Sequence, residues 1–300
     1  MLKIGIIGLG DIAQKAYLPI ISRKNVQLHL YTRQAATLAR VAHEYRLDKV
    51  YDNLAALIDS GIQAAFVHAS TAAHEEVLTQ LLRNNIHVHV DKPITADAPS
   101  SERLLALAEA ENLMLTVGFN RRHAPAYRQL QTMNDPSMIL MQKNRRALPA
   151  AVRDFIFDDF IHVVDTLLFL FPHPIARLLV SGRKHAGLLH HVTVQFVSAQ
   201  GHVAIGIMNR DSGTSEERLE VFSASEKRVV QNLSSVLVQR GGVESRSAPG
   251  DWEATLRTRG FEPMIDDFLH RLAHEPGARD NRQFLLAHQL CERIVGELGE

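Results

Sequence analysis

The stretch KIGIIGLGDIA, residues 3–13, decides the fold of the N-terminal half of this 300-residue chain. A short apolar run rich in isoleucine is followed by Gly8, Gly10 and Ala13, which form a G-x-G-x-x-A pattern, and a helical stretch comes next. Gly8 permits a tight turn, Gly10 lets a pyrophosphate approach the backbone, and the small Ala13 lets the helix pack close to the strand. The pattern predicts a dinucleotide-binding turn between a strand and a helix.

The rest of the chain shows two different patterns of predicted secondary structure. Up to about Gly118, the runs KIGII, VQLHLY, AAFVHA, IHVHV and LMLTVG alternate with helical patterns, which predicts a parallel sheet covered by helices. From about Ser137, the strand-like runs SMILMQKN, ARLLVSG, HHVTVQFV, HVAIGIMN and RLEVFSA follow one another. We therefore predict an α/β fold with a Rossmann domain over residues 1–120. An α+β domain with a large open, mostly antiparallel sheet is expected over residues 121–300, with one long loop, QRGGVESRSAPGDWE.

The second predicted strand ends in LHLYTRQ, which carries Thr32 and Arg33 and no acid at its tip. An acid there would accept a hydrogen bond from the ribose 2′-hydroxyl and repel a 2′-phosphate, whereas an arginine does the reverse. The sequence favours NADP over NAD. A purely solvated Arg33 is the alternative.

Composition excludes several classes of function. Lys plus Arg equals Asp plus Glu, 33 each, so no bulk positive field recruits nucleic acid or an anionic membrane. No apolar stretch approaches the roughly 20 residues of a membrane span. The single cysteine, Cys291, fits a reducing compartment, and we expect a cytoplasmic protein.

The stretch HVHVDKPI, residues 87–94, ends a strand pattern at Asp91, Lys92 and Pro93. Ligands bind at the carboxyl ends of strands in open α/β sheets, so Lys92 is either a solvated loop residue or a reactive group. His87 and His89 share a strand face, but we find no H-x-x-x-H on a helix and no third clustered ligand beside them. We therefore expect no metal site.

The stretch DDFIHVVDTLLFLF, residues 158–171, has the apolar spacing of one helix. At about 100° per residue, Asp158, His162 and Asp165 fall on one polar stripe. Such a stripe either faces water or surrounds a histidine whose pKa the carboxylates raise toward working pH for proton transfer.

With these motifs, the chain resembles the Gfo/Idh/MocA oxidoreductases, and within them the branch called virulence factor MviM-like. The resemblance rests on GIIGLGDIA, HASTAAHEE, VDKPIT, VGFNRRHAP and DDFIHVVDTLLFL. It implies a Rossmann domain, a nicotinamide cofactor, a sugar, polyol or related alcohol as substrate, and an open sheet that often forms the subunit interface. A homodimer or homotetramer is the expected assembly.

The resemblance also gives the site residues, with Asp91, Phe160 and Ser70 departing from the family's glutamate, glycine and proline. Lys92 and His162 would be catalytic, with Asp158 as their helper. The cofactor contacts would be Gly8, Gly10, Asp11, Ile12, Ala13, Thr32, Arg33, Ser70, His74, Asp91 and Lys92. The substrate contacts would be Lys92, Asn120, Arg121, Asp158 and His162, although arginine pairs such as Arg121 and Arg122 are usually solvated.

Hydride transfer between a nicotinamide and a sugar-like or cyclic alcohol or carbonyl is therefore the expected reaction. Lys92 or His162 would move the proton of the substrate oxygen. Two alternatives remain open. One is a regulatory protein that senses the cofactor without turnover, and the other is a glycosidase that uses the cofactor transiently.

Overall fold

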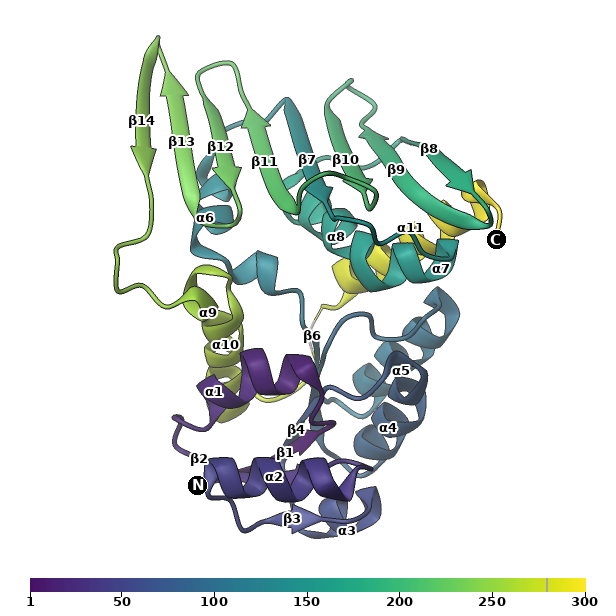
Figure 1. The fold of residues 1–300 in the computed structure, drawn as a ribbon, viewed down its shortest axis with the longest axis vertical. Coiled ribbons are helices and arrows are strands. Elements are labelled where there is room, and N and C mark those ends of the chain that lie inside the picture. The colour runs from purple at the N-terminus through teal and green to yellow at the C-terminus, as the bar shows by residue number, and fades with distance from the viewer. Residues whose placement is uncertain (279) are drawn as a thin grey trace. The chain divides into compact units, whose positions relative to one another are not determined.

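The computed structural model describes residues 1–278 and 280–300. The chain forms two compact units, one of residues 1–118 with 261–285 and the other of residues 119–260 with 286–300 (Figure 1). The predicted boundary at residue 120 lies beside the observed junction. The second unit is not continuous to the C-terminus, however, because residues 261–285 return to the first.

The first unit holds a six-stranded parallel sheet in the order β3-β2-β1-β4-β5-β6, the order of a dinucleotide-binding fold. Apolar residues of its central strands, such as Ile4, Ile6 and Phe66, are fully buried, as expected where helices cover both faces. The strands are β1 (Leu2–Ile7), β2 (Val26–Tyr31), β3 (Val50–Tyr51), β4 (Ala64–Val67), β5 (His87–Val90) and β6 (Leu115–Val117).

Two of the helices that connect these strands begin at residues whose side chains cap them. Asn53 caps α3 by accepting a hydrogen bond from the Ala56 backbone, and Asp97 caps α5 in the same way through Ser100. The helices are the π-helix η1 (Ala13–Tyr17), α1 (Leu18–Ile21), α2 (Ala35–Tyr45), α3 (Leu54–Asp59), α4 (Thr71–Arg83), α5 (Ala98–Ala110) and α10 (Phe261–His274).

Aromatic packing explains why α10 belongs to the first unit. The Phe268 ring lies 5.0 Å from the Phe66 ring of β4 and 5.5 Å from the His89 ring of β5, centroid to centroid. Such edge and tilted contacts add to the burial of large apolar surfaces. No local pattern in the sequence reveals this partner, because it lies about 200 residues away.

The second unit holds an eight-stranded sheet in the order β14-β13-β12-β11-β7-β10-β9-β8. The β7–β10 pair is parallel and the other pairs are antiparallel, which confirms the predicted large, mostly antiparallel sheet. Its strands are β7 (Met138–Asn144), β8 (Arg177–His185), β9 (Leu188–Val197), β10 (Val203–Asn209), β11 (Glu216–Phe222), β12 (Lys227–Gln231), β13 (Ser235–Arg240) and β14 (Val243–Ser247).

The predicted long loop QRGGVESRSAPGDWE is partly a hairpin, which corrects the sequence prediction. β13 continues to Arg240, the chain turns at Gly241 and Gly242, and β14 begins at Val243. Both glycines have positive φ, 55° and 79°, which tight hairpin turns require. Four of the five residues of β14 are charged or serine and all five residues are exposed, so no alternation of apolar residues marked it.

Helices cover one face of the eight-stranded sheet, and α8 packs directly on β7 and β10 (Figure 1). Gly206 of β10 makes room for α8, because a Cβ there would lie 2.8 Å from Val163 and 3.0 Å from Leu167. The helices are η2 (Asn120–His123), α6 (Pro125–Arg128), η3 (Gln129–Thr132), α7 (Val152–Asp154), the π-helix η4 (Phe155–Phe160), α8 (Ile161–Leu170), α9 (Thr255–Thr258) and α11 (Arg282–Leu298), which begins in the first unit. Among the described residues, no helix is both long and apolar enough to cross a bilayer.

Candidate functional site

A cleft of about 340 Å³ opens in the first unit where β1, β2 and β4 end. Carboxyl ends of parallel strands at the point where the strand order reverses are where such folds bind ligands. Of the predicted cofactor contacts, the cleft is lined by Gly8, Gly10, Thr32, Arg33 and Ser70.

The two glycines of the turn have different roles. Gly8 has a φ of +83°, and a Cβ there would lie 2.6 Å from the backbone nitrogen of Ala69 and from the carbonyl carbon of His68. A side chain at Gly8 is therefore excluded on both counts. At Gly10 a Cβ would meet nothing within 4 Å, so the space above this backbone is open. The turn has the shape that a dinucleotide pyrophosphate needs.

Thr32 and Arg33 follow β2 directly and lie beside this turn in the cleft. Arg33 is exposed, and within residues 1–278 and 280–300 no ion pair joins it to a carboxylate. Its guanidinium can therefore meet an anion from solution.

The other predicted residues of the turn lie outside the cleft lining. Asp11 is exposed and pairs with Lys15 at 2.5 Å. Ile12 precedes η1, and Ala13 is fully buried where the helix packs on the sheet. These residues place the backbone of the turn, and their side chains do not line the cleft.

His74 is buried beneath the loop that follows β5. Its Nδ1 lies 3.0 Å from the carbonyl oxygen of Pro93 and 3.2 Å from that of Ile94, and its Nε2 lies 3.0 Å from the carbonyl oxygen of Ala69. The ring thus ties the start of α4 to the D-K-P loop, in which the Lys92–Pro93 peptide is cis. We assign His74 the positioning of that loop in place of the predicted cofactor contact.

Asp91 and Lys92 follow β5 at once and are half-buried. Gly118, one residue past β6, admits them, because a Cβ there would lie 3.0 Å from Asp91 Oδ1 and 2.9 Å from the Tyr17 hydroxyl. Burial, with the nearby Asp91 charge, raises the pKa of Tyr17 well above its usual value. Lys92 therefore stands at the end of a central strand, as the sequence predicted.

His68, at the end of β4, also lines the cleft, and the sequence prediction missed it. Its ring lies 4.0 Å from the Tyr17 ring, centroid to centroid, at a tilt of 45°, and among the described residues neither ring nitrogen has a hydrogen-bond partner. Burial, and then the His89 and His74 charges, lowers its pKa well below the usual value. The hint in the sequence was its place two residues before Ser70, a predicted cofactor contact.

In the second unit, the predicted single helix over residues 158–171 is two elements, because η4 is a π-helix that ends at Phe160. Asp158 is exposed, His162 is half-buried, and Asp165 is 1% exposed. The three therefore do not share one solvent-facing stripe. π-Helical segments are rare and are often found at functional sites.

Asp165 forms a buried ion pair with Arg122. Arg122 donates from Nη2 to Asp165 Oδ1 at 2.6 Å and from Nε to the same oxygen at 2.9 Å. Burial raises the pKa of Asp165, and the Arg122 charge and hydrogen bond only partly offset it. Arg122 and Asp165 therefore fasten η2 to α8, so the predicted stripe is reduced to Asp158 and His162.

Asp159, which the sequence prediction passed over, is the buried acid of this segment. It forms ion pairs with Lys143 and, at 3.2 Å, with Arg145. Burial would raise the pKa of Asp159, but the two cations hold it well below its usual range. Burial and the Arg121 charge lower the pKa of Lys143 to about 7, against the opposing effect of Asp159 and Glu217.

Arg121 and Asn120, the predicted substrate contacts, are both buried and both engaged. Arg121 donates to Glu217 from Nε at 2.9 Å and from Nη2 at 2.6 Å, and it donates to Asn120 Oδ1 from Nη1. Asn120 donates to the carbonyl oxygen of Arg259 at 2.8 Å. Their donors are satisfied inside the second unit, which favours a structural role over substrate contact for both.

The parallel sheet of the first unit, with its strand order and open glycine turn, defines a dinucleotide-binding domain. The addition of a second, mostly antiparallel sheet is typical of the two-domain oxidoreductases that contain such a domain. Comparison with known families agrees. Residues 2–119 match the Gfo/Idh/MocA oxidoreductase family, NAD-binding Rossmann fold, and residues 125–241 match the YceM-like C-terminal domain. The chain belongs to the Gfo/Idh/MocA oxidoreductase family, and its resemblance to the MviM-like branch is confirmed.

Three relatives illustrate the range of this similarity. The chain is 36% identical to YceM of Salmonella typhimurium, a protein named as an oxidoreductase. The similarity covers 98% of this chain and 97% of YceM. The crystal structure of the dehydrogenase MviM from Clostridium difficile superposes with a TM-score of 0.94 at 29% identity, covering 99% of both chains. UDP-N-acetylglucosamine 3-dehydrogenase of Acidithiobacillus ferrooxidans is 26% identical over 92% of this chain and 90% of its own length.

Proposed function

We propose that the chain is an NADP-dependent oxidoreductase that acts on a hydroxyl or carbonyl group of a sugar-like or cyclic substrate. The observation that carries the proposal is the cleft in the first unit, where the open backbone of Gly10 lies beside the exposed Arg33. Membership of an oxidoreductase family supports the reaction class. The relative that is a UDP-N-acetylglucosamine 3-dehydrogenase supports a sugar hydroxyl as the reacting group.

The proposed roles divide by residue. Gly8 and Gly10 bind the pyrophosphate through their backbone, and Arg33 with the Thr32 hydroxyl binds the 2′-phosphate. Ser70, which lines the same cleft, is a further cofactor contact. A bound nicotinamide supplies or accepts the hydride.

Lys92 and His162 transfer the proton of the substrate oxygen, and Asp158 assists them. Lys92 is held by the loop that His74 fastens, and His162 is held by α8. Phe160, which replaces the family's glycine, is fully buried, so its bulk lies in the core of the second unit.

Cofactor preference tests the first part of the proposal. The 2′-phosphate should gain about 1.5 to 3 kcal/mol from Arg33 and Thr32, which corresponds to roughly 10- to 150-fold tighter binding of NADPH than of NADH. Fluorescence titration of both reduced cofactors should show this preference in the wild type and its loss or inversion in Arg33→Asp. Arg293→Asp, at an exposed position of α11, is the matched control. Equal affinity of the wild type for both cofactors would refute the preference.

Turnover tests the second part. With a panel of nucleotide sugars, sugars and cyclic polyols, Lys92→Ala and His162→Ala should each lower turnover by roughly 10²- to 10⁴-fold and leave NADPH affinity nearly unchanged. Asp158→Asn should cost less. Binding of NADPH without any turnover across the panel would favour a regulatory protein, and release of sugar from a glycoside with no net change in NADPH would favour a glycosidase.

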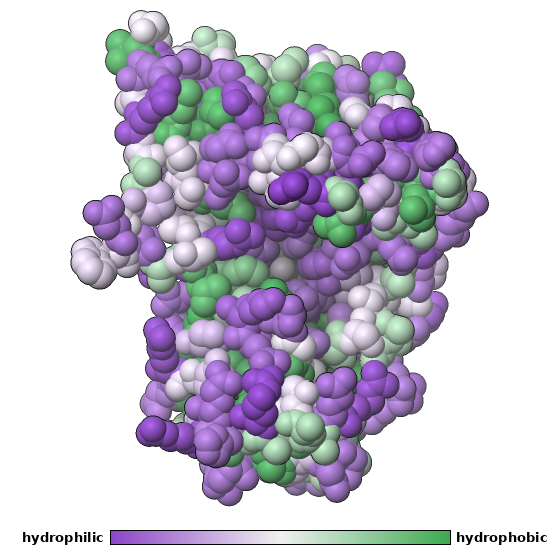
Figure 2. Space-filling model, in the orientation of Figure 1, coloured by the Kyte–Doolittle hydropathy of each residue, from purple (hydrophilic) through white to green (hydrophobic). Residues whose placement is uncertain are grey.

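The assembly is also part of the proposal. We propose a homodimer, or a dimer of dimers, through the face of the eight-stranded sheet that α8 leaves uncovered. On this face Met138 and Leu179 are 42% and 50% exposed, and Ile205 is half-buried. Figure 2 shows hydrophobic residues at the surface in the region of this sheet, interrupted by hydrophilic ones. Light scattering should give twice or four times the 33.5 kDa chain mass, and Ile205→Glu should shift it toward the monomer.

Cytoplasmic location completes the proposal. The single cysteine, Cys291, is fully buried in α11, and burial raises the pKa of its thiol well above the usual value. A buried, protonated thiol has no disulfide partner in the chain, which supports a reducing compartment. Fractionation of cells that express the tagged chain would test it, and recovery in a membrane or secreted fraction would contradict it.

A further inference from the structure

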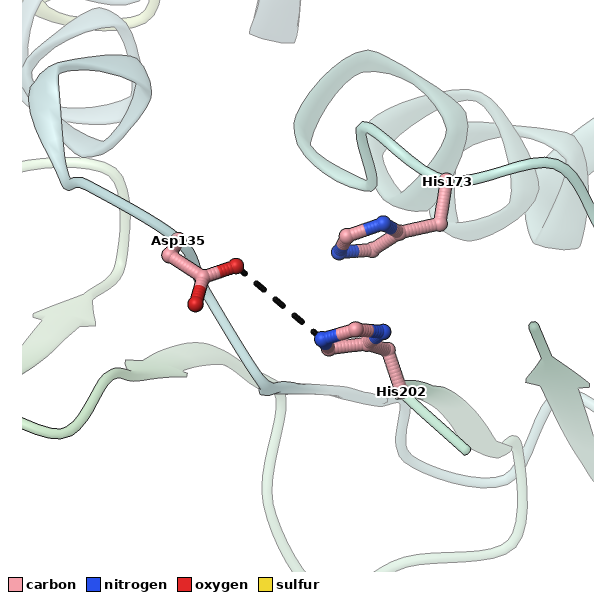
Figure 3. Close-up of side chains that lie close together, drawn as sticks. All are labelled: Asp135, His173 and His202. Atoms are coloured by element: carbon pink, nitrogen blue, oxygen red, sulfur yellow. Dashed lines mark ion pairs between the residues drawn. The ribbon is translucent and has the colours of Figure 1, made fainter. Parts of the chain in front are cut away.

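Three side chains from distant parts of the sequence meet at one end of the eight-stranded sheet. Asp135 lies just before β7, His173 just after α8, and His202 just before β10. One ligand atom of each side chain lies within 4.8 Å of those of the other two. Figure 3 shows the two imidazole rings one above the other, each with a ring nitrogen on the side of the Asp135 carboxylate.

His202 is already oriented as a ligand. Ser198 Oγ accepts a hydrogen bond from the backbone nitrogen of His202 at 3.0 Å and lies 3.2 Å from His202 Nδ1. A hydroxyl that accepts from Nδ1–H leaves the Nε2 lone pair for a metal, the usual arrangement around metal-binding histidines. That Nε2 lies 4.0 Å from Asp135 Oδ1, too far for a hydrogen bond.

His173 supplies the second and independent observation. Its Nε2 is buried, and no described residue offers it a hydrogen-bond partner. The ring is held by the His202 ring, stacked at 3.8 Å and 10°, and by the edge of Phe171 at 5.2 Å. Buried polar atoms in native proteins are normally paired, so an unpartnered nitrogen beside a carboxylate points to a missing ligand.

We propose that Asp135, His173 and His202 form a binding site for a divalent transition-metal ion such as Zn²⁺. Two imidazole nitrogens and one carboxylate oxygen are a common zinc donor set, with water in the fourth position. Tetrahedral zinc with ligands at about 2.0 Å brings donor atoms to about 3.3 Å from one another, so the cluster must contract. The Asp135 side chain is 84% exposed and can rotate inward, and the two rings must tilt out of their parallel stack.

The site would act on stability and not on hydride transfer. His162, which takes part in the proposed reaction, lies in the first turn of α8, about 12 Å along the helix from its last residue, Leu170. His173 follows that far end of α8, and the metal site adjoins the Met138 end of β7. Metal binding would link three segments that are far apart in the sequence. Because the ion binds the folded chain, it would stabilise the fold by mass action.

The sequence predicted no metal site because that prediction considered only histidines that lie near one another in the chain. The proposed ligands are separated by 38 and 29 positions and come together only in the fold. The expectation also overlooked His270 and His274, an H-x-x-x-H on α10 whose rings stack at 4.4 Å. That pair has no carboxylate in a three-ligand cluster among the described residues, so it serves as the matched control.

The test uses the full chain, stripped of metal by chelator, with ZnCl₂ and MgCl₂ as probes. Calorimetric titration should show one high-affinity Zn²⁺ per chain and no comparable Mg²⁺ binding. The thermal midpoint should rise with Zn²⁺, and the imidazole ¹⁵N resonances of His173 and His202 should shift on binding.

Asp135→Asn and His202→Ala should each weaken Zn²⁺ binding at least tenfold, while the double variant His270→Ala/His274→Ala should keep the wild-type affinity. Asp135→Asn changes an exposed side chain, so it keeps the test valid if His202→Ala misfolds. Unchanged affinity in Asp135→Asn, loss of binding only in the α10 double variant, or no Zn²⁺ binding tighter than about 100 μM would overturn the proposal.

Discussion

The Glu217–Arg121 ion pair should hold the second unit together, and Glu217→Gln tests this directly. The two side chains are 8% and 5% exposed, Arg121 donates twice to the Glu217 carboxylate, and the Tyr127 hydroxyl donates to it at 2.6 Å. Glutamine has one acceptor oxygen and places an NH₂ group against the other Arg121 donor. The variant therefore leaves the Arg121 charge buried without its counter-ion.

Two estimates of the loss agree. Breaking a buried ion pair by removing one partner costs about 3–5 kcal/mol. Burial would raise the pKa of Glu217, but the Arg121 charge and hydrogen bonds lower it from 4.5 to about 2, a shift equivalent to about 3 kcal/mol. For a chain of 300 residues, about 3 kcal/mol lowers the thermal midpoint by roughly 5 °C.

The assay is urea unfolding followed by circular dichroism, with Glu244→Gln as the control. Glu244 pairs with Arg246 on exposed β14, so its change should leave the unfolding midpoint unaltered. Because the pKa of Glu217 is lowered on folding, its stabilisation is complete above about pH 4.5 and is lost as the pH falls toward 2. The difference between wild type and Glu217→Gln should therefore shrink below pH 4.5. A loss under about 1 kcal/mol at pH 7 would show that Arg121 does not depend on Glu217 and would return it to the candidate substrate contacts.

Two further perturbations follow from the first unit. Gly8→Ala should abolish measurable NADPH binding and lower the thermal midpoint. The reason is that its Cβ would lie 2.6 Å from the Ala69 backbone nitrogen, at a φ of +83°. A variant that binds NADPH like the wild type in a titration would contradict the predicted turn. His68→Leu should reduce the loss of folding stability that the chain shows between pH 7 and pH 5. Because the pKa of buried His68 is lowered on folding, only the unfolded chain takes up this proton below about pH 6.5, which costs the wild type up to about 2 kcal/mol at pH 5. Urea unfolding at pH 7 and pH 5 should therefore show a smaller difference for His68→Leu than for wild type, and an equal difference would refute the assignment.

Local pattern was sufficient wherever a few adjacent residues determine the structure. β2 was predicted over residues 26–31 and is found there, and the glycine turn was predicted from its spacing together with its place between a strand and a helix. The strands β12, β13 and β14 were not among the predicted ones. In β12 (KRVVQ) two charged residues precede two apolar ones, and β14 (VESRS) has a single apolar residue, so neither shows the alternation of a strand. Their place in the sheet depends on the neighbouring strands and not on their own composition.

The buried ion pairs could not be predicted, because they depend on register. The antiparallel pairing of β7 with β11 sets Lys143 opposite Glu217, residues that are 74 positions apart in the chain. A shift of one residue would turn both side chains to the other face of the sheet. No motif carries such information in a single sequence, so Lys143 and Glu217 were passed over while Arg121 attracted attention as one of a basic pair.

The π-helix η4 explains why the sequence prediction passed over Asp159, the buried acid of the Asp158–Asp159 pair. A regular helix over residues 158–171 advances about 100° per residue and sets Asp158 near His162 and Asp165. Bonds from i to i+5 place an extra residue in the turn, which shifts the preceding positions by about one residue relative to α8. Asp159 therefore turns inward, and the Lys143 and Arg145 charges keep it ionised, against the effect of burial. An acid held ionised in this way cannot donate a proton near pH 7, so Asp159 is not the proton donor of the proposed reaction.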